Sequence, residues 1–502
     1  MPTYPIPHNA PSIPDPKPTS DPKFMGPKRN MYVDITGTIR SRPGVKATEN
    51  VGLAGSIVEG MVQRTNGTNK ILTCSRNGAT VYWDELNINS GPTSITTNRE
   101  LTTTLTLGLS ISQKPSIISY TASSKLFLSY PSAQNINTYI NPTSETNFNL
   151  TSAGFTPAWG STRIGKAVYL NNMIVASETI PTGVSTDIVR FSNVGDPLTW
   201  TAGDFFTAES SGDYVTTLET LNGNLLVFGP QNIEIREYDG SSFPLVPGGI
   251  INVGVAAGGS VCKFDDALYF IDYQKRLFTS DGRQVQLLPF SYNAYLMENL
   301  SYQLGSFTQM YAVMYRGKRL LFINDRANPG TKALVYDLDN QDSYEWDWGT
   351  TSSIGLGWSC LLSFPYIEKE TLIAGSADSV KVGVLAEDYH SGFAGTETQR
   401  KGITTGWINH GTNKVKKSTE LRIYVEQQPI SGQYPVVTVR YKNNGSTSIT
   451  ATRTLTPSAA TYQYACYRLK ALGHYRERQY EIFTDSAAAF RIARIEEDVT
   501  FL

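Results

Sequence analysis

The sequence predicts an all-β protein: a β-propeller of about seven blades, followed by a C-terminal β-sandwich or barrel-like domain and preceded by a proline-rich extended arm. Two observations predict this fold class. A short apolar strand pattern, a turn and a second strand recur seven times at intervals of about 40 to 55 residues, which is typical of propeller blades. About the last hundred residues instead alternate apolar and polar positions, the pattern of half-buried strands.

The N-terminal arm is predicted over residues 1–28, which carry nine of the 26 prolines. Proline fixes the backbone φ angle and has no N–H to donate, so we expect this stretch to enter neither a sheet nor a helix. It is either a disordered tail or a stiff arm that docks on a neighbouring subunit, because a stiff segment loses little entropy on docking. A lead-in segment over residues 29–49 follows.

The propeller is predicted over residues 50–397. Each repeat opens with a short apolar run, and most runs are followed within about ten residues by a partner strand, as in Ile233–Tyr238 and Leu334–Tyr336. The runs begin near Lys70, Lys125, Ala167, Asn224, Ala267, Arg319 and Thr371.

The C-terminal domain is predicted over residues 398–502. The segments Leu421–Val425, Val436–Tyr441 and Arg491–Ile495 alternate apolar and polar side chains with period two. Turns are expected at Asn443–Gly445 and at Gly473, so this region is interpreted as a separate β-sandwich or barrel.

The composition excludes several classes of protein. Lys plus Arg (43) nearly equals Asp plus Glu (44), so no overall field attracts nucleic acid or an anionic membrane. No apolar run is long enough for a transmembrane helix, and we expect no membrane anchor and synthesis in a cytoplasm. The four cysteines are far apart with no CxxC pair, which favours buried free thiols over disulfides or a zinc site.

Three segments resemble chemical motifs, and each lacks a required feature. Gly160–Lys166 fits most of a P-loop, but Ala167 offers no hydroxyl for magnesium and a strand follows where a helix is needed. Asp337–Asp342 suggests a calcium loop, yet Trp348 stands at the position of the bidentate glutamate. Ser192–Trp200 resembles a sialidase blade turn, but Asp196 follows the glycine instead of preceding it.

These failures predict a protein that is not an enzyme, with no catalytic residue, no metal site and no cofactor. The chain also has only four histidines and no GxSxG nucleophile elbow. Carboxylates that converge from different blades, as a glycosidase would need, are the alternative that stays open.

One basic cluster near the C-terminus is a candidate subunit-contact or DNA-proximal surface. It consists of Arg468, Lys470, Arg476 and Arg478, with tyrosines at 467, 475 and 480 between them. Cations interleaved with aromatic rings could follow a nucleic-acid backbone. Glu477 and Glu481 compensate part of the charge, however, and this favours a solvated strand face or a subunit contact.

Four short segments together resemble the packaged-DNA stabilisation proteins of short-tailed phages, also called tail-hub or nozzle proteins. The similarity extends from about Asn30 to the C-terminus. The segments are Arg40-Ser41-Arg42-Pro43-Gly44-Val45, then Ala208-Glu209-Ser210 leading through Leu225-Leu226-Val227-Phe228-Gly229 to Ile233-Glu234, then Gly282-Arg283, and last Gly375-Ser376-Ala377-Asp378-Ser379.

This resemblance implies a structural virion protein located in the tail. Such a protein forms a homo-oligomeric, six-fold ring below the head-to-tail adaptor and portal complex, retains the packaged DNA and forms the channel for genome ejection. Its implied partners are further copies of itself, the adaptor, tail fibre or spike proteins, the needle, and double-stranded DNA that passes without sequence specificity. The alternative is a carbohydrate-binding or carbohydrate-cleaving propeller, such as a receptor-binding tail protein, whose aromatic and acidic side chains would converge in a pocket on top of the blades.

Overall fold

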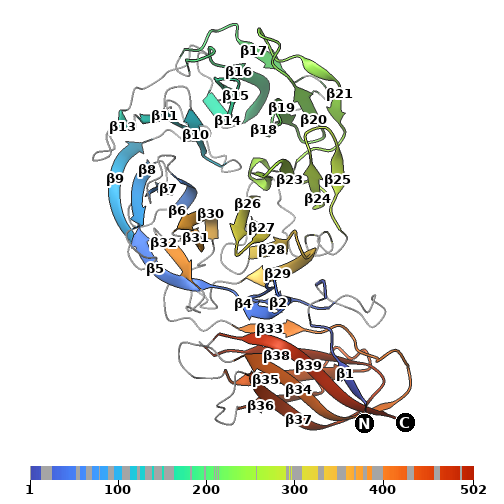
Figure 1. Ribbon diagram of the computed structural model, residues 1–502. Coiled ribbons are helices and arrows are strands. Elements are labelled where there is room, and N and C mark those ends of the chain that lie inside the picture. The colour runs from blue at the N-terminus through green and yellow to red at the C-terminus, as the bar shows by residue number, and fades with distance from the viewer. Residues whose placement is uncertain are drawn as a thin grey trace.

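The computed structural model shows a ring of blades with a β-sandwich domain below it (Figure 1). The two chain termini lie close together at the end of the sandwich that is farthest from the ring (Figure 1). The structure describes residues 2–8, 10–12, 25–51, 57–63, 70–77, 80–88, 95–104, 114–120, 125–129, 138–140, 150–151, 163–180, 184–196, 199–208, 210, 212, 214–255, 257–289, 293, 296, 308–325, 333–346, 358–366, 369–376, 381–386, 400–426, 435–456, 464–486 and 489–502.

The first five blades are four-stranded antiparallel sheets whose strands follow one another in chain order. Blade one contains β6 (Ile57–Gln63), β7 (Lys70–Asn77), β8 (Thr80–Ile88) and β9 (Ile95–Thr104). Blade two contains β10 (Ser116–Tyr120), β11 (Lys125–Ser129), β12 (Thr138–Ile140) and β13 (Leu150–Thr151). Blade three contains β14 (Arg163–Leu170), β15 (Met173–Thr179), β16 (Ser185–Phe191) and β17 (Phe205–Thr207).

Blade four contains β18 (Thr217–Leu221), β19 (Asn224–Phe228), β20 (Ile233–Arg236) and β21 (Leu245–Ile251). A short 3-10 helix, η2 (Gly258–Ser260), precedes blade five, which contains β22 (Val261–Phe264), β23 (Ala267–Ile271), β24 (Leu277–Ser280) and β25 (Val285–Leu287). Blade six contains β26 (Thr308–Tyr315), β27 (Lys318–Asp325), β28 (Ala333–Asp337) and β29 (Asp342–Trp346). In the described part of the chain, seven such units form the ring, so the predicted propeller is confirmed.

The position of a strand within its blade explains its sequence. The second strand of blade four, β19, has the sequence NLLVF and is buried from Leu225 to Phe228, because neighbouring blades cover both of its faces. Strands buried on both faces become continuous apolar runs. The outer strand β21 is mostly exposed and contains Pro247 and two glycines, as suits a sheet edge. The apolar runs that mark the repeat are therefore the inner strands of the blades.

The last blade is completed by the N-terminal part of the chain. Its strands are β30 (Trp358–Tyr366), β31 (Lys369–Ser376), β32 (Lys381–Ala386) and β5 (Gly44–Asn50). β5 pairs antiparallel with β32, with Ala47 opposite Val384. We expected residues 29–49 to form a lead-in that precedes the propeller, and instead their last part is the outer strand of blade seven. Pairing the two ends of the propeller in one sheet closes the ring without a covalent bond.

The C-terminal domain is a sandwich of two sheets. One sheet contains β3 (Met31–Val33), β4 (Ile39–Ser41), β39 (Arg491–Phe501), β34 (Lys416–Glu426), β37 (Tyr464–Tyr475) and β1 (Thr3–Pro5). The other contains β2 (Lys28–Arg29), β33 (Lys401–Thr404), β38 (Arg478–Thr484), β35 (Val437–Asn443) and β36 (Ala451–Leu455). Apolar side chains that alternate along β34, β35 and β39 fill the space between them.

The two parts of the molecule share one sheet. The two-residue strand β2 pairs in parallel with β29 of blade six, where Arg29 lies opposite Glu345. On its other side β2 pairs with β33, where Lys28 lies opposite Ile403. Blade six and half of the sandwich therefore form a continuous nine-stranded sheet. One hydrophobic core follows this sheet, because Tyr344 and Trp346 of the blade pack in the same cluster as the sandwich residues.

The arm enters a sheet, contrary to our expectation for a proline-rich segment. β1 pairs antiparallel with β39, and the Ile6 N–H donates to the Ile495 carbonyl at 2.9 Å. Hydrogen-bonded positions alternate along an edge strand, so the nitrogen of Pro5 points away from β39, where a missing donor has no cost. The sequence analysis counted the prolines and did not consider their spacing. That spacing leaves Ile6, whose N–H faces β39, free to form a ladder hydrogen bond.

One glycine lets the last blade pack against the first. A Cβ atom on Gly375 of β31 would lie 2.6 Å from Cys360 Sγ and 2.7 Å from Val58 Cγ1, the latter in blade one. Both neighbours are short, buried side chains with little freedom to move away. The first blade and the last can thus meet closely only where this position has no side chain.

We expect Gly375→Ala to lower the free energy of unfolding by about 1–3 kcal/mol, because overpacking at a blade interface forces neighbours out of place. Gly203→Ala is the matched control, since a Cβ at Gly203 would meet nothing within 4 Å. Denaturant titration of both variants measures the difference. Equal stability of the two variants would show that the contact between blades one and seven is not tight.

Candidate functional site

A buried ion pair lies where the arm, β2 and blade six meet. Lys28 Nζ lies 2.6 Å from Asp342 Oδ2, and both side chains are almost fully buried. The same ammonium donates to the carbonyl of Ala10 at 2.6 Å and to Ser12 Oγ at 2.9 Å, while the Ser12 N–H donates to Asp342 Oδ1 at 2.9 Å. Two segments of the N-terminal region and a strand 314 residues away from Lys28 are thus fixed at one point.

Burial acts on both members of this pair. It lowers the pKa of Lys28 and raises the pKa of Asp342, and in each case the charge of the partner opposes the shift. A buried ion pair adds little net stability, but removing one partner leaves an uncompensated charge and is strongly destabilising. The pair therefore acts mainly to specify how the two domains join.

The segment Arg40–Val45 lies at the same junction. Arg42 is 1% exposed, and its guanidinium donates to Asn30 Oδ1 at 2.8 Å and to the Pro43 carbonyl at 2.7 Å. The Trp346 indole N–H donates to the carbonyl of Met31 at 3.1 Å. This segment leads the chain out of the sandwich and directly into β5 of blade seven.

The segment around Ser210 fastens blade three to blade four. The Ser210 N–H donates to Glu234 Oε1 at 2.9 Å, and its hydroxyl also donates to this carboxylate. Asn232 Nδ2 donates to Ser210 Oγ at 2.9 Å. Arg236 completes the network, donating to Glu234 Oε2 at 2.8 Å and to the carbonyl of Thr207 at 2.9 Å. These hydrogen bonds hold the linker between blades three and four against β20, the third strand of blade four.

The remaining two segments also lie at contacts between blades. Gly282 has a φ of +90°, and a Cβ there would lie 3.3 Å from Leu221 of the preceding blade. Gly375 meets blade one, as described above. Residues 377–379 and Glu209 lie outside the described residues. Each of the four segments thus has a described residue at a contact between blades or beside the domain junction.

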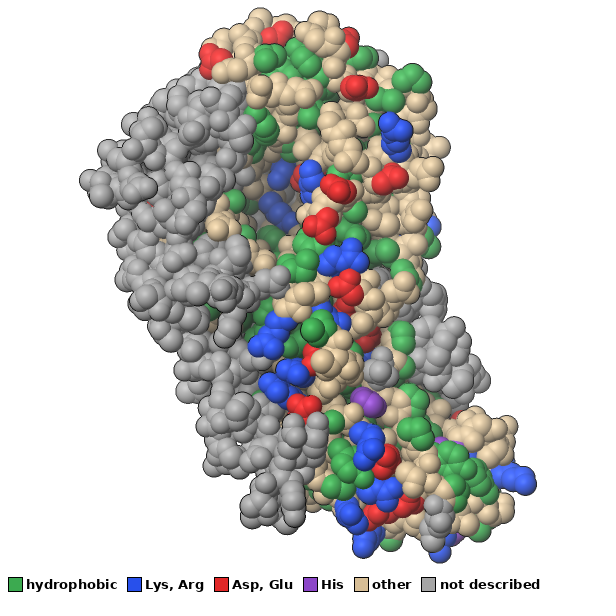
Figure 2. All heavy atoms as spheres, viewed as in Figure 1, with side chains coloured by type: hydrophobic (Ala, Val, Ile, Leu, Met, Phe, Trp, Pro, Cys, Tyr) green, Lys and Arg blue, Asp and Glu red, His purple; other side chains and the backbone are tan. Residues whose placement is uncertain are grey.

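A lysine crosses the centre of the propeller. Lys114, which leads into blade two, donates to the carbonyl of Met310 in blade six, and its ammonium lies 4.1 Å from the ring centroid of Tyr311. Burial lowers the pKa of Lys114 to about 8. Figure 2 shows a hollow in the ring of blades with basic side chains inside it. Since blades two and six are not neighbours, this contact ties opposite sides of the ring together.

The predicted basic cluster is divided between surface and interior. Arg468, Lys470 and Arg476 are exposed, whereas Arg478 is fully buried. The Arg478 guanidinium lies 4.0 Å from the ring centroid of Tyr475 and donates to Asn443 Oδ1 at 2.7 Å. Assigning Arg478 to a contact surface was therefore wrong, because β38 points this side chain between the two sheets.

Arg478 faces a buried carboxylate. Glu497 Oε1 lies 3.6 Å from Arg478 Nη1 and accepts a hydrogen bond from Tyr480 at 2.6 Å, while Oε2 accepts one from Tyr475 at 2.9 Å and lies 3.1 Å from His410 Nε2. Burial alone would raise the pKa of Glu497, but these hydrogen bonds and the charge of Arg478 outweigh it and lower that pKa. The network is a structural centre of the sandwich.

Acidic neighbours accompany Arg422 and Arg468 on the outer face of the β1–β39–β34–β37 sheet. Arg422 Nη1 lies 2.7 Å from Asp498 Oδ2 and 2.9 Å from Glu420 Oε2, and Arg468 lies 3.8 Å from Glu420. Figure 2 shows basic and acidic side chains intermixed on the visible face of this domain. The acids next to these cations come from β34 and β39, not from the neighbours in sequence that we had considered.

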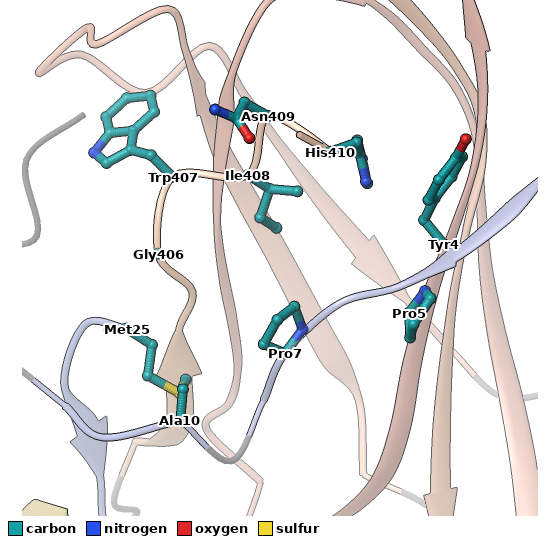
Figure 3. A pocket seen from close by; sticks show the side chains of 10 residues that line it. All are labelled: Tyr4, Pro5, Pro7, Ala10, Met25, Gly406, Trp407, Ile408, Asn409 and His410. Atoms are coloured by element: carbon teal, nitrogen blue, oxygen red, sulfur yellow. The ribbon is translucent and has the colours of Figure 1, made fainter. Parts of the chain in front are cut away.

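A pocket of about 330 Å³ lies between the arm and the loop that precedes β34 (Figure 3). The ring of Tyr4 packs against His410 with a centroid distance of 4.9 Å. Pro5, Pro7 and Met25 line the arm side, and Trp407 and Ile408 line the loop side. The lining is mainly apolar, and its residue His410 joins the pocket to the Glu497 network through its imidazole.

The motif-like segments have structural partners. Lys166 lies in strand β14 and not at the start of a helix. Asp337 accepts hydrogen bonds from Lys318 at 3.1 Å and from the Tyr344 hydroxyl at 2.8 Å. Asp196 accepts one from Thr199 within its turn at 2.7 Å. Among the described residues no group of three or more His, Cys, Asp or Glu side chains is arranged to hold a metal ion.

Three of the four cysteines are buried, and Cys466 is exposed on the outer face of β37. Burial raises the pKa of the Cys262 thiol to about 12. The expectation of four buried thiols is therefore wrong at Cys466. Successive side chains of a strand point to opposite faces, so Cys466 points outward next to the inward-pointing Tyr467.

Within the part of the chain that the structure describes, no helix is long and apolar enough to cross a membrane.

The seven sheets closed into a ring define the class of the protein as a β-propeller. A family model described as bacteriophage P22 Gp10, beta-propeller, matches residues 36–389, and the chain belongs to this family of packaged-DNA stabilisation and tail-hub proteins. It is therefore a virion protein. The match covers β4, β5 and all seven blades and ends before the C-terminal domain, earlier than the resemblance had implied.

Solved structures similar to this chain include a WD40 domain and a designed protein. The Pan2 WD40 domain of Neurospora crassa is 8% identical, with a TM-score of 0.38, over 68% of this chain and 95% of that one. The computationally designed Ika8 protein is also 8% identical, with a TM-score of 0.38, over 68% and 99% of the two chains. No curated protein matches the sequence.

We expect Arg478→Met to destabilise the C-terminal domain by about 3–5 kcal/mol, because Glu497 would lose its buried cation. Arg476→Ala is the matched control two residues away, and it should change stability by less than about 0.5 kcal/mol because that side chain is exposed. Thermal and denaturant unfolding of both variants provide the measurement. A mild effect at Arg478 would show that the Glu497 network does not need its guanidinium.

Proposed function

We propose that this protein is a subunit of the tail hub, or nozzle, of a short-tailed phage. Six copies form a closed ring below the head-to-tail adaptor, and the ring retains the packaged genome and forms the channel for its ejection. Tail fibres or spikes and a needle attach to it. The observation that carries this proposal is the family match over residues 36–389, which includes the whole propeller and its closing strand.

The rigid connection of the two domains supports this role. A ring under load from packaged DNA needs subunits that keep their shape, and here a nine-stranded sheet runs from blade six into the sandwich. In a closed ring each subunit contacts the next head to tail, and the last subunit contacts the first. The angle between the two domains of each subunit therefore determines whether the ring closes. A flexible linker between propeller and sandwich would not provide that angle.

The charge distribution supports a channel that does not hold DNA. The chain carries 43 basic and 44 acidic residues, and Arg422 and Arg468 on the outer sandwich face have acidic neighbours. Each phosphate contact releases counterions and strengthens binding, so an unbalanced basic lining would slow ejection. Because Lys114 crosses the centre of the propeller, the DNA path runs between subunits around the axis of the ring and not through the blades.

The ring is tested by electron microscopy of the purified protein and of particles that lack it. We expect closed six-fold rings from the recombinant chain. Particles made without the protein should package DNA and then lose it, and supplying the protein should restore retention. A stable monomer that shows no rings at high concentration, together with full genome retention in its absence, would contradict the proposal.

The hub is proposed to act without catalysis. Lys166→Ala removes the lysine of the P-loop-like segment and should leave ring formation and genome retention unchanged, because Lys166 lies in a strand. Lys28→Met is the contrasting variant, since it removes the cation of the domain junction and should prevent assembly. ATP and glycan hydrolysis are assayed with the purified ring. Turnover that disappears in Lys166→Ala would identify an enzyme instead.

A further inference from the structure

The N-terminal arm occupies a site built by the opposite end of the chain. Thr3 Oγ1 donates to Asp498 Oδ1 at 2.7 Å across 495 residues of sequence. The ring of Tyr4 lies between His410 and Phe501, at centroid distances of 4.9 Å and 5.8 Å. Arg422, which is already paired with Asp498, also donates to Thr3 Oγ1 at 3.2 Å. The site therefore matches this strand in shape and in hydrogen bonding.

The arm also fills part of the sandwich core. Ile6 is 1% exposed and belongs to the main hydrophobic cluster. Its N–H donates to Ile495, and the Val499 N–H lies 3.4 Å from the carbonyl of Pro2. Further along, Ser12 caps the carboxylate of Asp342. Strand addition of this kind obtains affinity from main-chain hydrogen bonds and specificity from side-chain pockets.

The arm is added at the edge of a sheet. β1 is added to the free half of β39, whose other half pairs with β4. On its other side the arm contacts the loop before β34 through Tyr4 and His410, and the 330 Å³ pocket lies between the rest of the arm and Trp407 (Figure 3). Because Ile6 fills part of the core and Ala10 and Ser12 bond the buried Lys28, the site needs an arm, either the subunit's own or that of another copy.

The sequence between the arm and β2 is long enough to allow another arrangement. Residues 13–24 connect Ser12 to Met25, and these twelve residues include four prolines. A chain of this length spans at most about 40 Å, which is comparable to the width of a small domain. The connection thus permits the arm to reach the same site on an adjacent copy.

We infer that in the assembled ring the arm of each copy, residues 2–12, occupies this site on the neighbouring copy. The inference rests on the proposed ring. Exchange makes the same contacts as the closed subunit, so it costs little, and a ring holds the neighbouring site at a high effective concentration. Each subunit then contributes a strand to the next, and the sandwich sheets are joined around the ring.

Two singly substituted chains test the exchange. Chains with Thr3→Cys are co-expressed with chains carrying Asp498→Cys, both in a Cys466→Ser background that removes the exposed thiol. Thr3 and Asp498 are directly opposite in β1 and β39, so a disulfide between two different chains forms only where arms are exchanged. We expect linked dimers from purified rings on non-reducing gels, and their loss on reduction.

A doubly substituted chain gives the complementary measurement. Rings of Thr3→Cys/Asp498→Cys should yield linked species up to the size of the ring. The matched control is Arg440→Cys/Glu481→Cys, a pair on adjacent strands inside one sandwich, which should yield monomers only. Rings with monomeric products from both pairs, and no linked dimers from the mixed chains, would overturn the exchange while leaving the ring intact. Failure to form any ring with the unsubstituted protein would instead refute the proposed function.

Discussion

The architecture depends on the contact between Lys28 and Asp342. This ion pair sits under the two-residue strand that turns blade six and half of the sandwich into one sheet, and it also binds the carbonyl and hydroxyl groups of the arm at Ala10 and Ser12. A strand of two residues forms few ladder hydrogen bonds, so side-chain contacts must hold it in register. The buried pair does this, since any slip of β2 would separate two charges in an apolar environment.

Around this junction, the most distinctive residues of the chain form contacts between its blades and between its two domains. Arg42 is packed between β2 and β5, Ser210 and Glu234 connect consecutive blades, and Gly375 lets the last blade touch the first. Propellers often place their distinctive residues in a pocket at the end of the channel. In this protein Lys114 crosses the centre of the propeller. The distinctive residues named above instead hold the blades and the two domains together.

Much of the fold could be predicted from the sequence, because inner blade strands such as β19 are apolar runs between hairpin turns. The parts that failed all depend on contacts between distant segments. From its sequence alone β5 was interpreted as a lead-in, and only its pairing with β32 makes it a blade strand. The proline-rich arm was likewise predicted to be unpaired, and only its pairing with the edge of β39 places it in a sheet. Arg478 belongs to an exposed-looking basic run, and only the position of Glu497 shows that it is buried.

Closure of blade seven by β5 also governs when the subunit can be completed on the ribosome. β5 is synthesised early, but its partner β32 follows about 330 residues later, a delay on the order of tens of seconds at usual rates of translation. The sandwich is completed later still, because its strand β39 follows all of the blade strands in the sequence. A truncated chain therefore lacks both the closed ring of blades and the complete C-terminal sheet.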